Sequence, residues 1–169
     1  MKLDNQNKLF EKYPKIFKQK DLSPQETAMC WGISCGDGWF GIIDCLCSNI
    51  KNHVENVNRK VNYEYEQKKK SIVPIKANYL VCEATQVKSK FGGLRFYVNS
   101  NDEYIRGLIS MAESMSYKTC EECGNPGEPT SSGWVYTLCG LCKDEMIKIK
   151  KKRCDDFKKL LDSKGADDE

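Results

Sequence analysis

A long stripe of apolar residues at helical spacing is the clearest pattern in the chain. From residue 39 onward, apolar side chains recur every three or four residues, at Trp39, Ile43, Leu46, Ile50, Val54, Val57, Val61 and Tyr65. Positions three and four apart lie on one face of an α-helix, whereas a strand alternates at every second residue. The spacing therefore predicts one long helix, on the order of 40 Å at 1.5 Å per residue.

The pattern changes to that of strands between residues 72 and 98. Runs rich in β-branched and aromatic residues cover 72–75, 79–87 and 94–98, and Gly92-Gly93 supplies a turn between the last two runs. Within the last strand, Arg95 and Tyr97 share one face. A meander of this size needs a helix against one face to be stable. We expect a small antiparallel sheet packed on the long helix.

Shorter helical segments are expected on both sides of this unit. Residues 1–20 carry apolar residues at helical spacing but contain Pro14, which interrupts a long helix. Two capping boxes, at 23–26 and 100–103, each predict a helix start, because the first residue caps the helix and the glutamate three positions later bonds back to it. The second of these helices, over 101–118, precedes a change in composition.

After Lys118 the chain becomes rich in cysteine, glycine and proline. This change predicts three parts: an α+β body over 1–100, a bridging helix over 101–118, and a four-cysteine module with a C-terminal helix over 119–169. The fold class is therefore α+β, with a small metal module at its end.

Two CxxC pairs provide the strongest chemical signal. Cys120 and Cys123 are separated by fifteen residues from Cys139 and Cys142, and a loop, a turn and a returning strand lie between the pairs. The second pair opens into a helical pattern with Ile147, Cys154, Phe157 and Leu161 on one stripe. This layout is that of a treble clef or zinc ribbon. Four thiolates complete the tetrahedral coordination of zinc and leave no position for water, so one structural zinc is expected.

Six further cysteines have weaker spacing. Cys30, Cys35, Cys45 and Cys47 fall within eighteen residues and leave a second metal site open, although buried cysteine is also a common small apolar residue. Cys82 and Cys154 are expected in the core.

The N-terminal residues lack the apolar stretch of a signal peptide, so we expect a cytoplasmic protein. In that compartment, metal binding explains many cysteines better than disulfides do.

Composition and charge narrow the classes of function. A single histidine, His53, excludes mechanisms that need two, and no phosphate-binding loop or Ser-His-Asp set is present, so an enzyme is not expected. No apolar run is long enough to cross a membrane. The formal net charge of +3 is mildly basic; it permits nucleic acid as a partner without requiring it.

Three motifs carry a resemblance to a known family. They are Gly36-Asp37-Gly38-Trp39 leading into the long helix, the stretch from Gln86 to Tyr97 that contains Lys-Phe-Gly-Gly-Leu-Arg-Phe-Tyr, and the paired CxxC motifs. Together they resemble a family of small zinc-binding proteins that recur in bacteriophages and prophages. The resemblance spans about residues 30–145 and implies a phage origin and zinc binding, but no particular activity.

These observations lead to a hypothesis about function. We expect a non-enzymatic phage accessory protein that binds a host macromolecule, first a host protein such as a component of a bacterial defence system, CRISPR among them; a nucleic-acid-binding zinc protein is the alternative. The residues expected to contact the partner are Arg95, Tyr97, Trp134, Tyr136, Lys148, Lys151 and Lys152. Packing between module and body explains the aromatic residues equally well, and a solvated helix face explains the lysines. The oligomeric state stays open.

Overall fold

The computed structural model describes residues 1–68, 78–130 and 133–164, with the side chains of residue 68 and of 159–164 left undescribed. The main helices are α1 (Leu3–Lys12), α2 (Phe40–Lys68), α3 (Glu103–Ser116) and α4 (Gly140–Lys164). The strands are β1 (Ile33–Ser34), β2 (Ala84–Lys90), β3 (Gly93–Val98), β4 (Glu128–Pro129) and β5 (Thr137–Leu138). The predicted α+β class, with one long helix and a small sheet, is confirmed.

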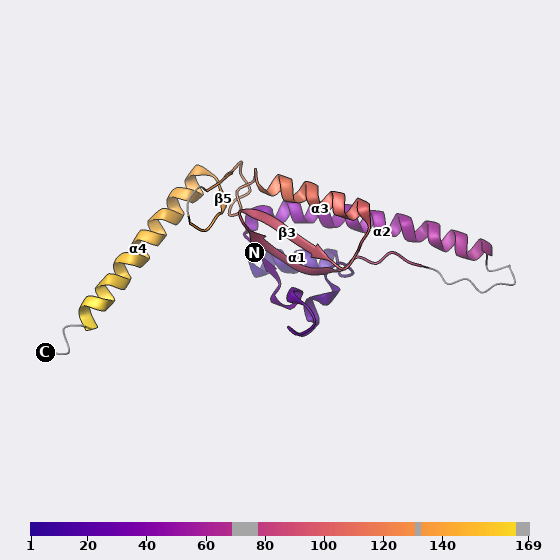
Figure 1. Cartoon of the computed structure of the whole chain (residues 1–169), viewed down its shortest axis with the longest axis horizontal. Coiled ribbons are helices and arrows are strands. Elements are labelled where there is room, and N and C mark those ends of the chain that lie inside the picture. Colours follow the sequence, from indigo (N-terminus) through magenta and orange to yellow (C-terminus); the bar gives the residue numbers. More distant parts are fainter. Residues whose placement is uncertain (69–77, 131–132, 165–169) are drawn as a thin grey trace.

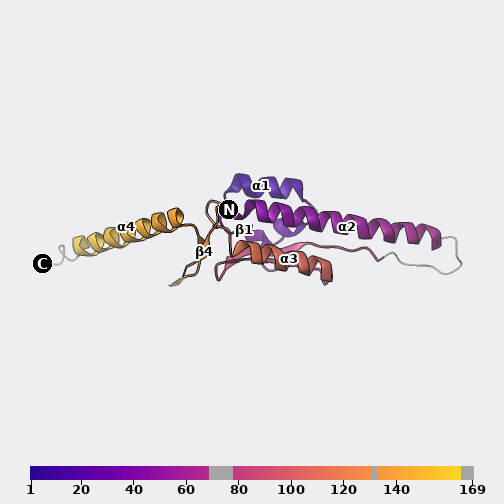
Figure 2. The ribbon, with the colours of Figure 1, turned by 90° about the horizontal axis from the view of Figure 1, so that it is seen from above.

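Helix α2 is the long element around which the body is built. It lies beside α3 and α1, and it extends well beyond the sheet (Figures 1 and 2). The first half of the predicted stripe is buried, from Trp39 through Ile43 and Leu46 to Ile50. From Val54 onward the same stripe is only half-buried, because this part of α2 passes beyond the sheet and α3.

The main sheet is mixed, in the order β1-β2-β3. Strands β2 and β3 form the predicted antiparallel hairpin, with Val87 opposite Phe96, and β1 adds in parallel to β2. The second strand begins at residue 84, later than the expected residue 79, and the turn is made by Phe91 and Gly92, since Gly93 already belongs to β3. The expected strand at 72–75 lies outside the described residues.

Neither capping box begins a helix as expected: no α-helix follows the first, and the helix after the second begins two residues later than predicted. At the first, the backbone N–H and hydroxyl of Ser23 both bond to the Glu26 carboxylate, but the chain makes a single turn there and no α-helix follows. At the second, α3 begins at residue 103 and is capped by Asp102, whose carboxylate accepts the backbone N–H of Ile105. Asp102, not Ser100, is therefore the N-cap.

Helix α4 projects away from the body at the end opposite to the free end of α2 (Figure 1). The stripe predicted on this helix is exposed wherever its side chains are described: Ile147, Cys154 and Phe157 all face solvent. The expectation that Cys154 is a core residue is therefore wrong, whereas Cys82 is buried as expected. Within the described ranges, no helix combines the length and apolar character that a membrane span requires.

Candidate metal centre

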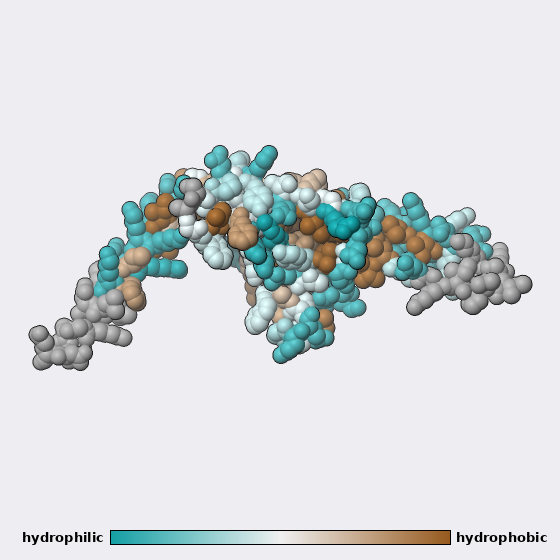
Figure 3. Space-filling model, viewed as in Figure 1, coloured by the Kyte–Doolittle hydropathy of each residue, from teal (hydrophilic) through white to brown (hydrophobic). Residues whose placement is uncertain are grey.

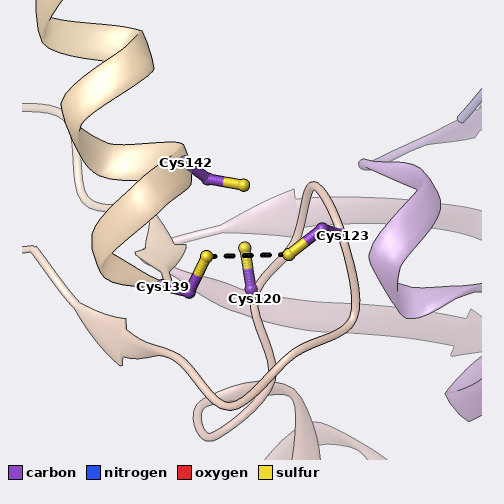
Figure 4. A group of neighbouring side chains, drawn as sticks. All are labelled: Cys120, Cys123, Cys139 and Cys142. Atoms are coloured by element: carbon purple, nitrogen blue, oxygen red, sulfur yellow. Dashed lines mark hydrogen bonds between the residues drawn. The ribbon is translucent and has the colours of Figure 1, made fainter.

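Four cysteine sulfurs converge at the base of α4. The Sγ atoms of Cys120, Cys123, Cys139 and Cys142 all lie within 4.8 Å of one another. They point toward a common centre from a loop on one side and from the start of α4 on the other (Figure 4). The distance from Cys123 Sγ to Cys139 Sγ is 3.6 Å. The predicted ligand set is thus brought together, in a geometry that could hold one metal ion.

Local backbone structure explains why the sulfurs converge. The first pair lies on a tight loop, in which Gly124 N–H donates to Cys120 O and Cys120 N–H donates to Asn125 O. Gly124 has φ +79°, a left-handed conformation that glycine adopts without steric cost. The second pair spans the start of α4, so Cys139 and Cys142 are three positions apart on a first helical turn and present sulfurs on one side.

Two of the clustered thiols, Cys139 and Cys142, differ in how readily they ionise. The backbone N–H of Cys142 donates to Cys139 and lowers the pKa of that thiol to about 7. The pKa of the Cys142 thiol is raised, first because its hydrogen bond with Cys139 favours the neutral donor. One sulfur is therefore readily ionised, while its neighbour keeps a proton until a cation replaces it.

The loop that carries the first pair is docked on the Gly36–Trp39 motif of the body. Gly38 N–H donates to Glu121 O at 2.8 Å, and the buried Trp39 indole N–H donates to Thr119 O at 2.8 Å. A Cβ on Gly38 would collide with Cys120 O, Gly124 N and Cys123 N. Only glycine allows the body backbone to approach the ligand loop this closely.

A buried carboxylate strengthens this contact. Glu121 is 5% exposed, and burial raises the pKa of its carboxyl. One oxygen accepts the Gly36 backbone N–H at 3.1 Å, and the other accepts the Ser89 hydroxyl at 2.9 Å. Glu121 thus joins three segments that are far apart in sequence, and it follows Cys120 of the four-cysteine cluster directly.

The tip of the β2–β3 hairpin contacts the other side of the module. The Thr137 hydroxyl donates to Gly92 O at 2.6 Å, and Glu121 N–H donates to Thr137 O at 2.8 Å. Nearby, Arg95 donates to the Tyr117 hydroxyl at 2.9 Å and forms an ion pair with Glu113. Both body motifs that carry the family resemblance therefore surround the segment that leads into the metal centre.

The residues expected to contact a partner fall into two groups. Arg95 is mostly buried and is held by its intramolecular bonds, so it is not available as a free contact. Tyr97 and Tyr136 are partly exposed, and Trp134 is 69% exposed. The three lysines Lys148, Lys151 and Lys152 are all exposed on α4.

The remaining candidates do not join the centre. Cys35 and Cys47 are buried in the core, which raises the pKa of both thiols, to about 12 for Cys35. Within the described residues, one group of metal-binding side chains forms, and it contains neither of them. His53 Nε2 lies 3.1 Å from Asp102 Oδ1, although it is not aligned for a hydrogen bond.

The centre as a whole is a closed set of four sulfurs, held between the body and the first turn of a projecting helix. Sequence reasoning identified all four cysteines of this cluster but missed the Glu121 network and the docking of the Cys120–Cys123 loop on the body. The sequence did hold one signal for this docking: Gly36 and Gly38 flank a single residue, and two glycines so placed permit another backbone to approach closely.

Comparison of the chain with protein-family models, curated proteins and solved structures finds no match.

Proposed function

We propose that the four cysteines bind one structural zinc ion. A tetrahedral zinc–thiolate site with bonds of about 2.3 Å has sulfur–sulfur edges of about 3.8 Å, close to the 3.6 Å between Cys123 and Cys139. An all-sulfur set favours zinc over the hard cations, which prefer oxygen. With four protein ligands the ion has no open position for water or substrate, and its role is to hold the first turn of α4 against the ligand loop.

We further propose that the chain is a non-enzymatic binding protein, and that α4 is the arm that meets its partner. Among the described side chains of α4, the exposed large apolar ones are Leu141, Ile147, Ile149 and Phe157, and Trp134 is exposed shortly before the helix. Figure 3 shows brown, apolar atoms among teal ones along the arm. Exposed apolar residues gathered on one projecting element are typical of a protein interaction surface.

The charge of the arm also favours a protein as the partner. The basic residues on α4 are flanked by two acidic pairs, Asp144-Glu145 and Asp155-Asp156. A track for phosphates gains nothing from these carboxylates, whereas a protein interface uses mixed charge for orientation around apolar anchors. Together with the family resemblance, this supports a phage accessory protein that acts in the host cytoplasm on a host protein, such as a component of a defence system.

Site-specific crosslinking tests this proposal. A photoreactive residue is placed at Phe157 on α4 or, as the matched control, at Tyr63, which is equally exposed near the free end of α2. In the bacterial host, the photoreactive residue at position 157 should crosslink one protein of defined mass. Nuclease treatment should not reduce the yield of this product. The double variant Ile147→Ser/Ile149→Ser, with the photoreactive residue still at position 157 and with the full zinc content, should lose capture.

Two results would contradict the proposal. The proposal of a protein partner on α4 fails if the photoreactive residue captures equally well at positions 157 and 63. It also fails if nuclease treatment abolishes the capture. Elemental analysis of the purified chain should give one zinc, and a zinc content of zero would overturn the assignment of the metal centre independently of the partner.

A further inference from the structure

Three lysine–aromatic pairs gather around the tip of the β2–β3 hairpin and the adjoining metal module. The pairs are Lys88 with Tyr97, Lys90 with Phe91, and Lys150 with Tyr136, at 5.8, 5.0 and 5.7 Å from ammonium nitrogen to ring centre. We call these six residues the lysine–aromatic cluster. The first pair lies on the outer face of the hairpin, opposite the face that carries the core residues.

The hairpin tip and the module are in direct contact, which brings the three pairs to one region. Thr137 donates to Gly92 O at the tip, and a Cβ on Gly92 would lie 2.9 Å from Val135 Cγ1. Tyr136 stands between these two contacting residues in sequence. In Figure 1 the tip lies beside β5, close to where α4 begins.

The lysines of the cluster differ from the other cations that lie over aromatic rings. Elsewhere in the described structure, Lys12, Lys20 and Arg95 also lie over rings, and each of them is paired with a carboxylate. Lys88, Lys90 and Lys150 form no ion pair within the described residues. The cluster is therefore a place where positive charge beside aromatic rings is left uncompensated.

Phe91 adds an independent observation. It has φ +54° and, with Gly92 at φ +74°, makes a two-residue hairpin loop that favours Asn-Gly and disfavours a bulky residue in the first position. Phe91 is 66% exposed, so burial does not offset the backbone strain. A strained, exposed aromatic side chain is typical of a binding site, because strain is retained where a ligand uses the geometry.

We propose that the lysine–aromatic cluster binds single-stranded nucleic acid. Exposed aromatic rings on a sheet face stack on unpaired bases, and flexible lysines beside them reach the adjacent phosphates. A duplex does not offer its base faces to these rings, and an acidic peptide offers no bases. Because rings and ammonium groups contact bases and phosphates and not the sugar, DNA and RNA single strands should bind with similar affinity.

The zinc-loaded full chain is titrated against fluorescent oligothymidylate and oligouridylate, and binding is followed by anisotropy at several salt concentrations. In the variant Lys88→Gln/Lys90→Gln/Lys150→Gln, the slope of log affinity against log salt should flatten by about two units, at about 0.7 per phosphate contact on single strands. The control variant Lys8→Gln/Lys51→Gln/Lys60→Gln removes the same charge from exposed lysines elsewhere and should keep the slope.

Ring variants separate stacking from charge. Phe91→Asn suits the hairpin turn, so it should keep or raise the melting temperature while affinity falls by roughly five- to hundred-fold. Tyr97→Ala should lose a similar factor, and Tyr97→Phe, which keeps the ring, should bind normally. The proposal is overturned if Phe91→Asn binds as well as the unaltered chain, if both lysine variants behave alike, or if duplex DNA or oligoglutamate competes as well as single strands.

Discussion

Replacing Gly38 with alanine tests whether the metal centre depends on its contact with the body. The added Cβ would lie 2.8 Å from Cys123 N and closer still to Cys120 O and Gly124 N. All three are backbone atoms of the ligand loop, so no flexible side chain can move aside. Either the loop must shift away from the body, or the start of α2 must move.

The expected cost follows from two contributions. Overpacking a well-packed contact costs about 1–3 kcal/mol, and weakening the bond from Gly38 N–H to Glu121 O costs about 1 kcal/mol more. If this strain is borne by the metal-bound form, about 2–4 kcal/mol corresponds to roughly 30- to 900-fold weaker zinc binding. If the metal-free form bears it as well, the melting temperature of the metal-free chain falls instead.

Gly41→Ala is the matched control, because a Cβ at Gly41 meets nothing within 4 Å. In a helix, alanine is favoured over glycine by up to about 1 kcal/mol, so this variant should be neutral or slightly more stable. Zinc affinity is measured by competition with a chromogenic chelator, and stability by thermal melting with and without zinc. If Gly38→Ala matches Gly41→Ala in both measurements, the docking of the ligand loop on the body does not matter energetically.

Substitutions at three further positions test other parts of the fold by urea denaturation. Trp39→Phe removes the donor to Thr119 O and buried volume, so it should cost about 2–4 kcal/mol and weaken zinc binding; unchanged stability would contradict the role of the indole. Asp102→Ala removes the α3 cap and should cost about 1 kcal/mol, whereas Asp102→Asn still caps and should cost less. His53→Ala should lose the stacking on Tyr104, worth about 0.5–1.5 kcal/mol, yet leave partner capture intact; loss of capture in the folded, zinc-loaded variant would indicate a functional histidine.

The parts of the fold that the sequence predicted well are those governed by local rules. The α2 stripe repeats every three or four residues over seven turns, and the CxxC spacing is set by one tight loop and one helical turn. Both patterns are read within a short window of sequence. The boundaries of β2 and the N-cap of α3 were less accurate, because neighbouring residues such as Ser100 and Asp102 offer the same capping chemistry.

The contacts that sequence reasoning missed join segments far apart in the chain. Nothing periodic links Gly36 to Glu121 or Trp39 to Thr119, which are 85 and 80 residues apart. The burial predicted for Cys154 on the α4 stripe was wrong for a related reason. Apolar residues such as Ile147 and Phe157 have helical spacing whether they are buried against this chain or against a partner. Phe91 carries a local signal in its two-residue loop, but only once the register of the hairpin is known.

The separation between Trp39 and Thr119 has a consequence for biosynthesis. A ribosome that has completed α2 and the β2–β3 hairpin has not yet supplied the carbonyl that accepts the indole N–H, nor the loop that covers Gly36 and Gly38. The surface of the nascent body around Gly36 and Trp39 therefore stays uncovered until the first CxxC pair emerges from the ribosome. The four-cysteine cluster stays incomplete until the second pair follows. On the proposed zinc assignment, the metal supply at that moment should set how quickly the newly made chain closes, so metal starvation should prolong the lifetime of a protease-sensitive, half-assembled form.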